Sequence, residues 1–304
     1  MSTYIQVFKA YYDRVPPVLR GMALIVISTL GFSGMHSVIR GLGKEDLHPF
    51  EIAFFRNFFG LLVLAPLFMR HGVGALRTQH LPLHALRGGL QICAMLMFFT
   101  AVTITPLAKV SAMSFTAPLF ATIGAVLILG ERIRARRITA LVFGFVGAVL
   151  IIRPGVVEID LGAILVLTSS AIWAGAMLII KHVSRTDSSV VITAYMGIFM
   201  TPLSFLAAVW FWTWPEPHHY LLFILMGALG SLAHVAMAQA FKEADATAIL
   251  PLDFTRLLWS AALGFMLFGE IPELWTWIGG ITIFASTTYI AYREAMQQSS
   301  KKSG

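Results

Sequence analysis

The stretch “LILGERIRARR” at Leu127–Arg137 decides the fold, because the chain repeats it as “MLFGEIPELW” at Met266–Trp275. Both copies are apolar helix sequence that ends in Gly-Glu, and the two dipeptides align at an offset of 139 residues. The first copy then runs into four arginines, whereas the second continues into proline and another glutamate. A second pair, “STLGFSGMHSVIR” (Ser28–Arg40) and “SSAIWAGAMLIIK” (Ser169–Lys181), aligns at an offset of 141. The chain therefore contains two repeats of about 140 residues.

The composition indicates a membrane protein with many spans. Of the 304 residues 58% are hydrophobic and 12% are charged, and the mean hydropathy is +0.79. A soluble domain carries about 25% charged residues, and a run of about 20 apolar residues can cross a bilayer. Short connections leave no room for a soluble domain. Ten spans are expected at residues 20–40, 50–69, 82–104, 107–129, 138–152, 161–181, 189–212, 219–241, 246–268 and 273–292.

The lysines and arginines predict how these spans are oriented. With both termini in the cytoplasm, fifteen of the 22 lie in cytoplasmic segments and four in outer segments, namely Arg40, Lys44, Lys109 and Arg153. Each repeat has five spans, and because five is odd the second repeat must enter the membrane upside down. The end of the fourth span then faces the cytoplasm and carries the arginines, whereas the end of the ninth span faces outside and carries none.

The expected fold is therefore an all-α membrane protein made of two inverted five-helix repeats. Residues 1–19 are expected to form a cytoplasmic segment, 20–155 the first repeat, 156–295 the second repeat and 296–304 a disordered tail. Inverted repeats are typical of secondary transporters, which bind their substrate near the membrane midplane between the halves. A duplication can also build a stable bundle that transports nothing.

Three segments resemble the drug/metabolite transporter superfamily, and specifically its EamA-type members with two five-span repeats. They are “FEIAFFRNFFGLLVLAP” in span 2, “SAMSFTAPLFATIGAVLILGER” in span 4 and “ADATAILPLDFTRLLWSAALGFMLFGE” in span 9. The resemblance covers residues 20 to 293 and implies a central cavity lined mainly by spans 1, 3, 4, 6, 8 and 9. Within the superfamily, “FEIAFFR”, “HALRG” and “EADATA” are most similar to S-adenosylmethionine uptake transporters, but riboflavin and metallophore or amino-acid transporters share much of this sequence.

Asp253 and Arg256 are the leading candidates for binding a substrate. An ionisable side chain within the bilayer costs about 2.5–3.5 kcal/mol on insertion scales, so each one needs a reason to be there. At i, i+3 spacing the two side chains share a helix face, and Pro251 just before them removes a backbone hydrogen bond. Arg256 would hold a carboxylate of the substrate, while Asp253 would hold an amine or carry a coupling proton. An internal ion pair that only neutralises itself is the alternative.

Other residues are candidates for the lining of the same cavity. Ser114 aligns with Asp253 in the repeat, and Gln91 lies deeper in span 3 than Arg87. Trp173 aligns with Phe32, where an aromatic side chain can stack on a flat ring or simply pack between helices. His36 and His234 could titrate in the range that a proton-coupled cycle uses, although a lone membrane histidine is more often a packing residue.

A further group of polar residues within the spans is expected to be structural or to act in gating. Span 2 is not among the principal cavity helices, and a charged side chain near the end of span 3 can snorkel toward the interface. The residues are Glu51, Arg56, Asn57 and Arg87.

Several activities are not supported by any motif. The sequence has no phosphate-binding loop and no HExxH, GxSxG or clustered Cys/His motif that would suggest a metal or nucleophile site, and the single cysteine, Cys93, is expected to be a buried thiol. We therefore expect no enzyme activity, cofactor, metal or nucleic-acid partner; an integral-membrane enzyme or a passive channel is a distant alternative. Small residues at four-residue spacing, Ala140, Gly144 and Ala148, allow close contact between helices. We expect this contact to lie within the chain, and a homodimer is the alternative. The expected function is inner-membrane transport of a small polar metabolite, with S-adenosylmethionine or a similar zwitterion favoured over riboflavin, and with a coupling proton or ion left open.

Overall fold

The computed structural model describes residues 15–71, 78–129, 135–153, 160–183, 186–187, 189–243 and 250–302. Residues 1–14 of the N-terminal segment and 130–134, which include arginines of the opening stretch, lie outside this set. All regular structure in the described part is helical. In chain order the helices are α2 (Pro17–Lys44), α3 (Pro49–His71), α4 (Leu81–Ile104), α5 (Leu107–Ser114), α6 (Ala117–Leu129), α7 (Ala135–Ile152), α8 (Leu161–Val183), α9 (Ser189–Ala208), the 3₁₀ helix η2 (Val209–Phe211), α10 (Pro217–Glu243), the 3₁₀ helix η3 (Leu250–Phe254), α12 (Thr255–Phe268) and α13 (Leu274–Lys302).

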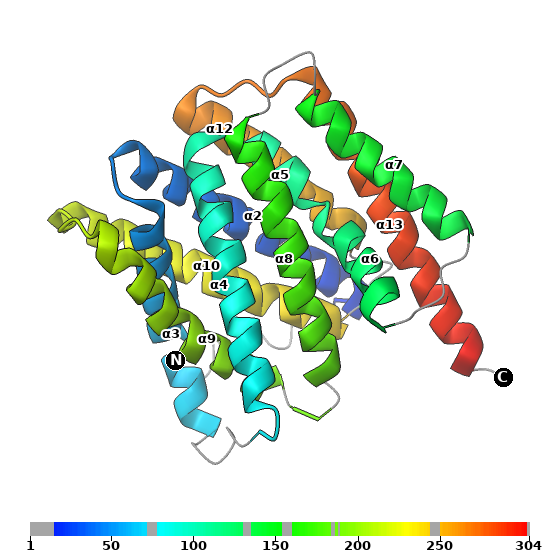
Figure 1. Cartoon of the computed structure of the whole chain (residues 1–304), viewed down its shortest axis with the longest axis horizontal. Helices are drawn as coiled ribbons and strands as arrows, with labels where there is room; N and C mark the ends of the chain where they lie inside the picture. The colour runs from blue at the N-terminus through cyan, green and yellow to red at the C-terminus, as the bar shows by residue number, and fades with distance from the viewer. Residues whose placement is uncertain are drawn as a thin grey trace.

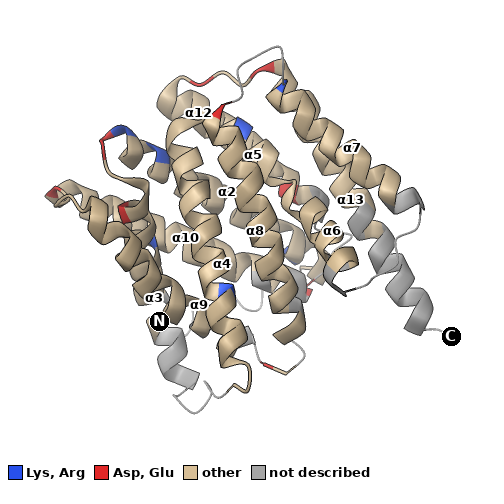
Figure 2. Ribbon diagram, viewed as in Figure 1, with Lys and Arg blue, Asp and Glu red and all other residues tan. Residues whose placement is uncertain are grey.

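The helices have the length and surface expected of membrane spans. Among the described residues, five are long and apolar enough to cross a bilayer: Pro17–Lys44, Leu81–Ile104, Leu107–Gly124, Leu161–Ile180 and Pro217–Met237. Large apolar side chains such as Leu127 and Met266 are more than three-quarters exposed, as expected where lipid replaces water. Charged residues lie mostly near helix ends, with a few inside the bundle (Figure 2). The all-α class is confirmed, while the full set of ten spans stays a prediction.

Helix contacts follow the repeat. The extensive contact of α2 with α10 has its counterpart in that of α8 with α4, and the contact of α3 with α10 is matched by that of α9 with α4. Three further contacts, α7 with α13, α3 with α9 and α5 with α12, join equivalent helices of the two repeats to each other. In Figure 1, α7 and α13 lie side by side at one edge of the bundle, and α3 and α9 lie at the opposite edge. The two repeats are therefore interleaved rather than placed next to each other.

The repeated Gly-Glu dipeptide has a structural role at the end of α12. Gly269 adopts a left-handed backbone conformation (φ +68°), and its N–H and that of Glu270 bond to the carbonyl groups of Phe265 and Gly264. This is the hydrogen-bonding pattern with which a glycine ends a helix. The glycine stops the helix, and the chain direction it sets brings the glutamate back over the bundle end.

Glu270 then joins both repeats at one end of the bundle, which we call the Glu270 end. One carboxylate oxygen pairs with Arg40 of α2, and the other accepts the N–H of Leu107 at 2.9 Å, at the first turn of α5. Arg40 also donates to the carbonyls of Val102 and Thr105 at the end of α4. Both side chains of the ion pair are about nine-tenths buried. Because α5 begins and α12 ends here, the equivalent fourth and ninth spans run in opposite directions.

A cluster of His84, Thr78 and Asp187 lies at the opposite end of the bundle, which we call the Asp187 end. His84 Nε2 of α4 lies 2.7 Å from Asp187 Oδ2, and the Thr78 hydroxyl donates to the same oxygen at 2.6 Å. Asp187 lies between α8 and α9. Burial alone would raise the pKa of Asp187, but the hydrogen bonds from His84 and Thr78 outweigh it and hold the pKa below the usual range.

Small residues allow α7 and α13 to approach closely. The Ala140 carbonyl accepts a hydrogen bond from Ser286, and a Cβ added at Gly147 would lie 2.7 Å from the Gly279 carbonyl oxygen. Gly144 also lies against Ser286, and Ala148 is buried. The small-residue stripe of span 5 is therefore occupied by packing within the chain, and a homodimer stays a prediction without support from this stripe.

Two details differ from the expectation. Cys93 is exposed on the outside of the bundle rather than buried, because the apolar run around it faces the surroundings as well as the core. The last helix, α13, continues to Lys302, through most of the segment for which a tail was expected. Its Glu, Ala, Met, Gln and Lys residues favour helix, which periodicity of apolar residues alone does not register.

Replacing Gly147 with alanine should destabilise the protein by about 1–3 kcal/mol, the usual cost of overpacking a tight contact. The added carbon would meet backbone atoms of Gly279 and Ile283, at 2.7 and 2.9 Å, and these cannot rotate away. Gly89→Ala is the matched control, because a Cβ there would meet no described atom within 4 Å. Thermal melts in detergent should show a lower Tm for the first variant only; equal Tm values would contradict this account of the α7–α13 contact.

Asp187→Asn should lower the Tm at neutral pH and should make the Tm change less as the pH falls into the acid range. A carboxyl whose pKa is lower in the folded state stabilises the fold above its unfolded pKa of about 4 and loses this contribution as pH falls through the folded value. Melts of both proteins from pH 7 down to pH 3 would measure the effect. Wild type should lose more stability than the variant below about pH 4; parallel curves would show that the cluster does not stabilise this end.

Candidate functional site

The helices of the fourth and ninth spans change geometry at equivalent places in the two repeats. The fourth span breaks at Phe115–Thr116, between α5 and α6, whereas the described part of the ninth changes from the 3₁₀ helix η3 to the α-helix α12 at Phe254–Thr255 without a gap. These dipeptides align at the offset of 139 residues. The sequence predicted the loss of a backbone hydrogen bond at Pro251 in the ninth span, but the break in the fourth span was not predicted. Pro118 lacks the N–H that would bond to the Ser114 carbonyl, so the chain tightens into the Thr116-to-Met113 bond instead.

The aromatic residues of the two breaks meet in the middle of the bundle. The rings of Phe115 and Phe254 are stacked at 25° with their centroids 6.2 Å apart. Phe284 of α13 packs against Phe254 at 4.8 Å. The guanidinium of Arg256 lies over the ring of Phe115, 5.1 Å from its centroid, which is within the range of a cation–π contact. The interface between the repeats thus combines flat apolar surfaces with a charge.

Asp253 and Arg256 form an ion pair beside these rings. Arg256 Nη2 donates to Asp253 Oδ2 at 2.7 Å, and the two side chains remain 23% and 28% exposed. Arg256 Nε is buried and has no hydrogen-bond partner among the described residues. Ser114, the counterpart of Asp253, lies one residue before Phe115 and donates its hydroxyl to the Ser111 carbonyl. The pair predicted from the sequence is therefore present, incompletely satisfied and accessible.

A series of hydroxyl contacts fixes the helix that carries Arg256. Thr29 of α2 is 2.7 Å from Thr255, and Ser33 of α2 is 3.1 Å from Ser260 and from the Arg256 carbonyl. Ser111 of α5 donates to Ser260 at 2.6 Å. Within a membrane such contacts contribute about 0.6–2 kcal/mol each. They tie α12 to both α2 and α5 and so hold the ion pair in place.

A second polar group faces the ion pair from α2, α3 and α10. His234 Nδ1 donates to the Gly230 carbonyl at 2.8 Å, and the Arg56 guanidinium packs against the same glycine. The ring of His36 lies against Phe98. Arg56 and Arg256 are both close enough to His36 to act on it electrostatically. The structure thus brings His36, His234 and Arg56 near Arg256, although Arg56 was expected to be structural or gating.

The other candidates lie elsewhere. Gln91 and Arg87 face α9, where Gln91 Nε2 contacts the Met196 sulfur and Arg87 donates to the Ile192 carbonyl at 2.9 Å. The Gln91 oxygen is buried and has no partner in the described part of the chain. Trp173 is half-buried on α8 and has no ring contact with the residues of the two breaks in the described structure. These three residues are not joined to the ion pair.

The remaining two residues of span 2 connect helices. Glu51 accepts hydrogen bonds from the backbone and hydroxyl of Thr213, in the segment before α10. The Asn57 amide donates to Ser204 of α9 at 3.2 Å and contacts the Met95 sulfur. These contacts join α3 to neighbouring segments, and a structural or gating role for Glu51 and Asn57 stays a prediction.

Residues that sequence reasoning missed include Phe115, Phe254 and the Arg40–Glu270 pair. The two phenylalanines carried a usable signal, because Phe-Thr is the part of “SFTAPL” and “DFTRLL” that both repeats share. Nothing in the sequence links Arg40 with Glu270, which are far apart along the chain. Their pairing depends on how the two repeats interleave.

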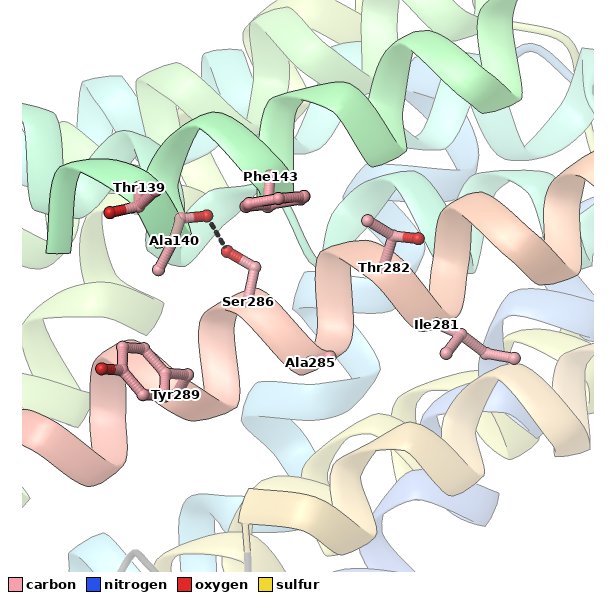
Figure 3. Close-up of a pocket in the computed structure, with 8 residues that line it drawn as sticks. All are labelled: Thr139, Ala140, Phe143, Ile281, Thr282, Ala285, Ser286 and Tyr289. Carbon is pink, nitrogen blue, oxygen red and sulfur yellow. Dashed lines mark hydrogen bonds between the residues drawn. The ribbon is translucent and has the colours of Figure 1, made fainter. Parts of the chain in front are cut away.

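The structure also contains an open groove of about 530 Å³, which lies between α7 and α13 (Figure 3). Phe143, Ile281 and Tyr289 contribute to its mostly apolar lining. It lies on the edge helices, away from Asp253 and Arg256. Its apolar walls and its position suit contact with lipid tails rather than binding of a polar solute.

Comparison with known proteins decides the family. The model of the EamA-like transporter family matches residues 19–153 and again residues 160–292. The chain belongs to the EamA-like transporter family. The resemblance inferred from the sequence is therefore confirmed, and this family member is a multi-pass membrane protein and a transporter rather than an enzyme. A solved crystal structure aligns with a TM-score of 0.60 at 17% identity, covering 90% of this chain and 98% of the other, which supports the fold alone.

Relatives within the family differ in what they carry. The chain is 31% identical over 289 residues to the S-adenosylmethionine uptake transporter of Rickettsia prowazekii (strain Madrid E), covering 95% of this chain and 98% of that one. It is 30% identical to the riboflavin transporter of Brucella anthropi, over 80% of this chain and 88% of that one. The pseudopaline exporter CntI of Pseudomonas aeruginosa is 27% identical, with 86% and 93% covered. This EamA transporter therefore has relatives that move different small molecules in both directions.

Proposed function

We propose that this EamA transporter moves a small zwitterionic metabolite across the inner membrane by alternating access. The observation that carries the proposal is the Asp253–Arg256 pair, which is partly exposed inside an apolar bundle, beside the break of the fourth span and the change from 3₁₀ to α-helix in the ninth. Discontinuous helices at a repeat interface are where secondary transporters bind their substrates. The 15-to-4 distribution of basic residues supports cytoplasmic termini, which makes the Glu270 end the outer end.

A ligand with both charges could exchange with the ion pair without leaving either residue unpaired. A carboxylate of the substrate would take the place of Asp253 on Arg256, and an amine would take the place of Arg256 on Asp253. Charge-assisted hydrogen bonds of this kind are about twice as strong as neutral ones. Arg56 adds a second positive charge nearby, so the site favours a ligand that carries at least one carboxylate.

S-adenosylmethionine or a similar amino-acid derivative is the leading candidate for the substrate. Its amino-acid moiety has the required two charges, and its adenine could stack on the rings of Phe115 and Phe254. Riboflavin is the second candidate, because the same two rings offer a flat surface and several relatives are riboflavin transporters. Riboflavin has no carboxylate for Arg256, which is why it ranks second.

His36 and His234 are candidates for proton coupling. Both are close to Arg56, and His36 is also close to Arg256. A proton on either imidazole would add a positive charge beside the guanidinium groups and strengthen the field that holds a carboxylate, so protonation and carboxylate binding would favour each other. Transport measured with and without a pH gradient would distinguish coupling to protons from coupling to another ion or exchange.

The Arg40–Glu270 pair is proposed to act as the outer gate. It joins α2, α4 and α5 of the first repeat to the end of α12 in the second. Opening the outer side requires these elements to separate, so the pair must break once in every cycle. Its near-complete burial makes it a much stronger connection than an exposed ion pair.

Arg256→Ala should lower transport of S-adenosylmethionine by about 30-fold or more. Losing one member of a buried charge pair costs about 2–5 kcal/mol, the lower end applies to a pair that is 23% and 28% exposed, and 1.4 kcal/mol is tenfold in affinity. Uptake and counterflow of radiolabelled substrate in proteoliposomes would measure the loss, with riboflavin tested in parallel. Arg153→Ala is the matched control, because this arginine pairs with Glu273 at the surface of the edge helices. Normal flux through Arg256→Ala would remove Arg256 from the site, and transport of riboflavin alone would reverse the order of the two candidates.

Glu270→Gln should favour the outward-open state. The substitution removes the charge from a buried hydrogen-bonded pair, whose contribution is about 1.5–3 kcal/mol, so opening should rise about tenfold or more. A cysteine placed at Ser114 in a Cys93→Ser background should react correspondingly faster with a membrane-impermeant thiol reagent added from outside. Glu273→Gln is the matched control, because the Glu273 side chain is 64% exposed in its pair with Arg153. Equal rates in the two variants would exclude Glu270 from the gate.

A further inference from the structure

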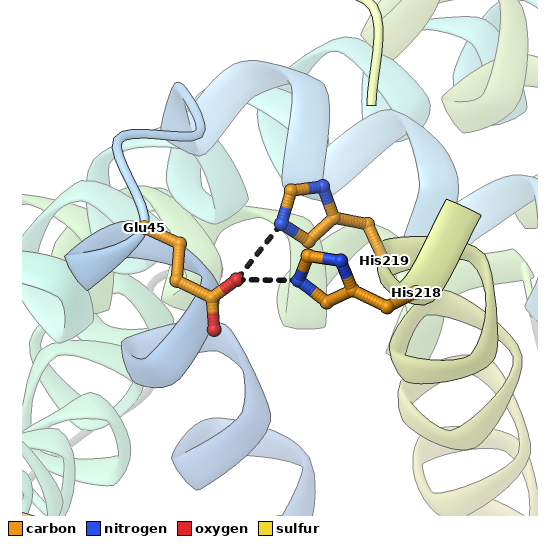
Figure 4. A group of neighbouring side chains, drawn as sticks. All are labelled: Glu45, His218 and His219. Atoms are coloured by element: carbon orange, nitrogen blue, oxygen red, sulfur yellow. Dashed lines mark hydrogen bonds and ion pairs between the residues drawn. The ribbon is translucent and has the colours of Figure 1, made fainter. Parts of the chain in front are cut away.

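Two histidines and a glutamate meet at the Glu270 end, away from the proposed substrate site. Glu45 follows the last residue of α2, and His218 and His219 lie in the first turn of α10. Figure 4 shows both imidazoles directed at the same carboxylate oxygen. Glu45 Oε2 is 2.9 Å from His218 Nε2 and 2.8 Å from His219 Nε2. The cluster joins the first repeat to the second.

The three side chains are held in position by the backbone around them. Asp46 has a left-handed conformation (φ 62°) that ends α2 and turns the chain, and the Glu45 N–H bonds to the Leu42 carbonyl. On the other side, Glu216 lies between two prolines in “WPEPHHY”, and proline fixes φ and suits the first position of a helix. The arrangement therefore does not depend on flexible loops.

The donor atoms have the spacing of metal ligands. The two imidazole nitrogens and the carboxylate oxygen all lie within 4.8 Å of one another. A zinc ion binds such atoms at about 2.0–2.2 Å in tetrahedral geometry, which sets them about 3.4 Å from one another. The two histidine–carboxylate contacts of 2.9 and 2.8 Å would have to widen by about half an ångström, and the imidazoles would have to rotate, to place all three atoms around one ion.

A second carboxylate supports His218 from behind. Glu216 Oε2 lies 3.4 Å from His218 Nδ1, on the side of the ring opposite Glu45. Histidines that bind metals usually donate the N–H of the second ring nitrogen to a carboxylate or carbonyl, which directs the lone pair of the first at the ion. His218 has this arrangement, with Nε2 directed at the centre of the cluster.

The hydrogen bonds of His219 predict that a metal ion would bind with only moderate affinity. Its Nδ1 accepts the N–H of Glu216 at 3.0 Å, so the ring proton is on Nε2 and points at Glu45. A metal at Nε2 must displace that proton and release the Glu216 N–H. The ion therefore competes with an existing hydrogen-bonded arrangement, and we expect micromolar rather than nanomolar affinity.

We propose that Glu45, His218 and His219 form a binding site for a divalent transition-metal ion of the zinc class. Imidazole nitrogens favour Zn²⁺, Co²⁺ and Ni²⁺ over Mg²⁺ and Ca²⁺, which prefer oxygen ligands. His218 is 55% and Glu45 45% exposed, so an ion can enter from the solvent. A bound ion would brace α2 against α10. Slowing of transport by zinc would follow only if the proposed function is right, whereas the binding of zinc tests the site alone.

Calorimetric titration of ZnCl₂ into the full-length protein in detergent, after removal of metals with EDTA, tests the proposal. Wild type should bind one ion per chain, and both His218→Ala and Glu45→Gln should weaken binding at least tenfold. Glu216→Gln should weaken it by about 10–100-fold, the usual effect of losing a carboxylate behind a metal-bound histidine. Mg²⁺ should give no binding heat. Co²⁺ should give visible absorption bands that are lost in His218→Ala.

His182→Ala is the matched control for the other histidines of the chain. This residue is exposed on α8, where its ring lies near that of His80, and its removal should leave zinc binding unchanged. Glu45→Gln keeps a hydrogen-bond acceptor for both imidazoles, so an unaltered melting profile would show that it folds. Zinc binding that survives both His218→Ala and Glu45→Gln, or that disappears in His182→Ala, would overturn the proposal, as would the absence of saturable binding to wild type.

Discussion

A helix inside an apolar bundle can be interrupted only where other groups satisfy its backbone, because neither lipid nor apolar side chains can do so. This constraint governs the centre of the molecule, where one helix breaks at Phe115–Thr116 and another changes from 3₁₀ to α at the equivalent Phe254–Thr255. Hydroxyl groups gather nearby, and Ser260 contacts both Ser33 and Ser111. The breaks, the hydroxyl contacts and the ion pair are therefore parts of one arrangement, which can exist only where both repeats cover it.

Much of this molecule could be predicted from the sequence. Long apolar runs gave the helices, the repeated Gly-Glu gave the duplication, and the cost of burying charge pointed to Asp253 and Arg256. The break in the fourth span was missed because hydropathy measures only how apolar a run is, although Pro118 lies beside it. The Arg40–Glu270 pair was missed for a different reason. Its partners are brought together by the interleaving of the repeats, and no local pattern in either segment encodes that contact.

The symmetry of the two repeats is as informative where it fails as where it holds. Phe and Thr are kept at both breaks, so the backbone interruption belongs to both halves. Ser114 and Ala117 of the first repeat, however, correspond to Asp253 and Arg256 of the second. One half thus supplies the charged groups and the other supplies a neutral surface of similar shape. A duplicated scaffold can accommodate polar chemistry on one side only, because a second ion pair opposite the first would add another desolvation cost.

Helix α5 connects the Glu270 end to the centre of the molecule. It has eight residues, so it is a rigid rod about 12 Å long. The N–H of Leu107 at one end is held by Glu270, and Ser114 at the other end adjoins the ring on which Arg256 lies. Releasing Glu270 from Arg40 would therefore free the start of this rod as well, and any tilt would move Phe115 beneath the guanidinium. The single short helix α5 therefore links the proposed gate, Arg40–Glu270, to the proposed binding surface at Phe115 and Arg256.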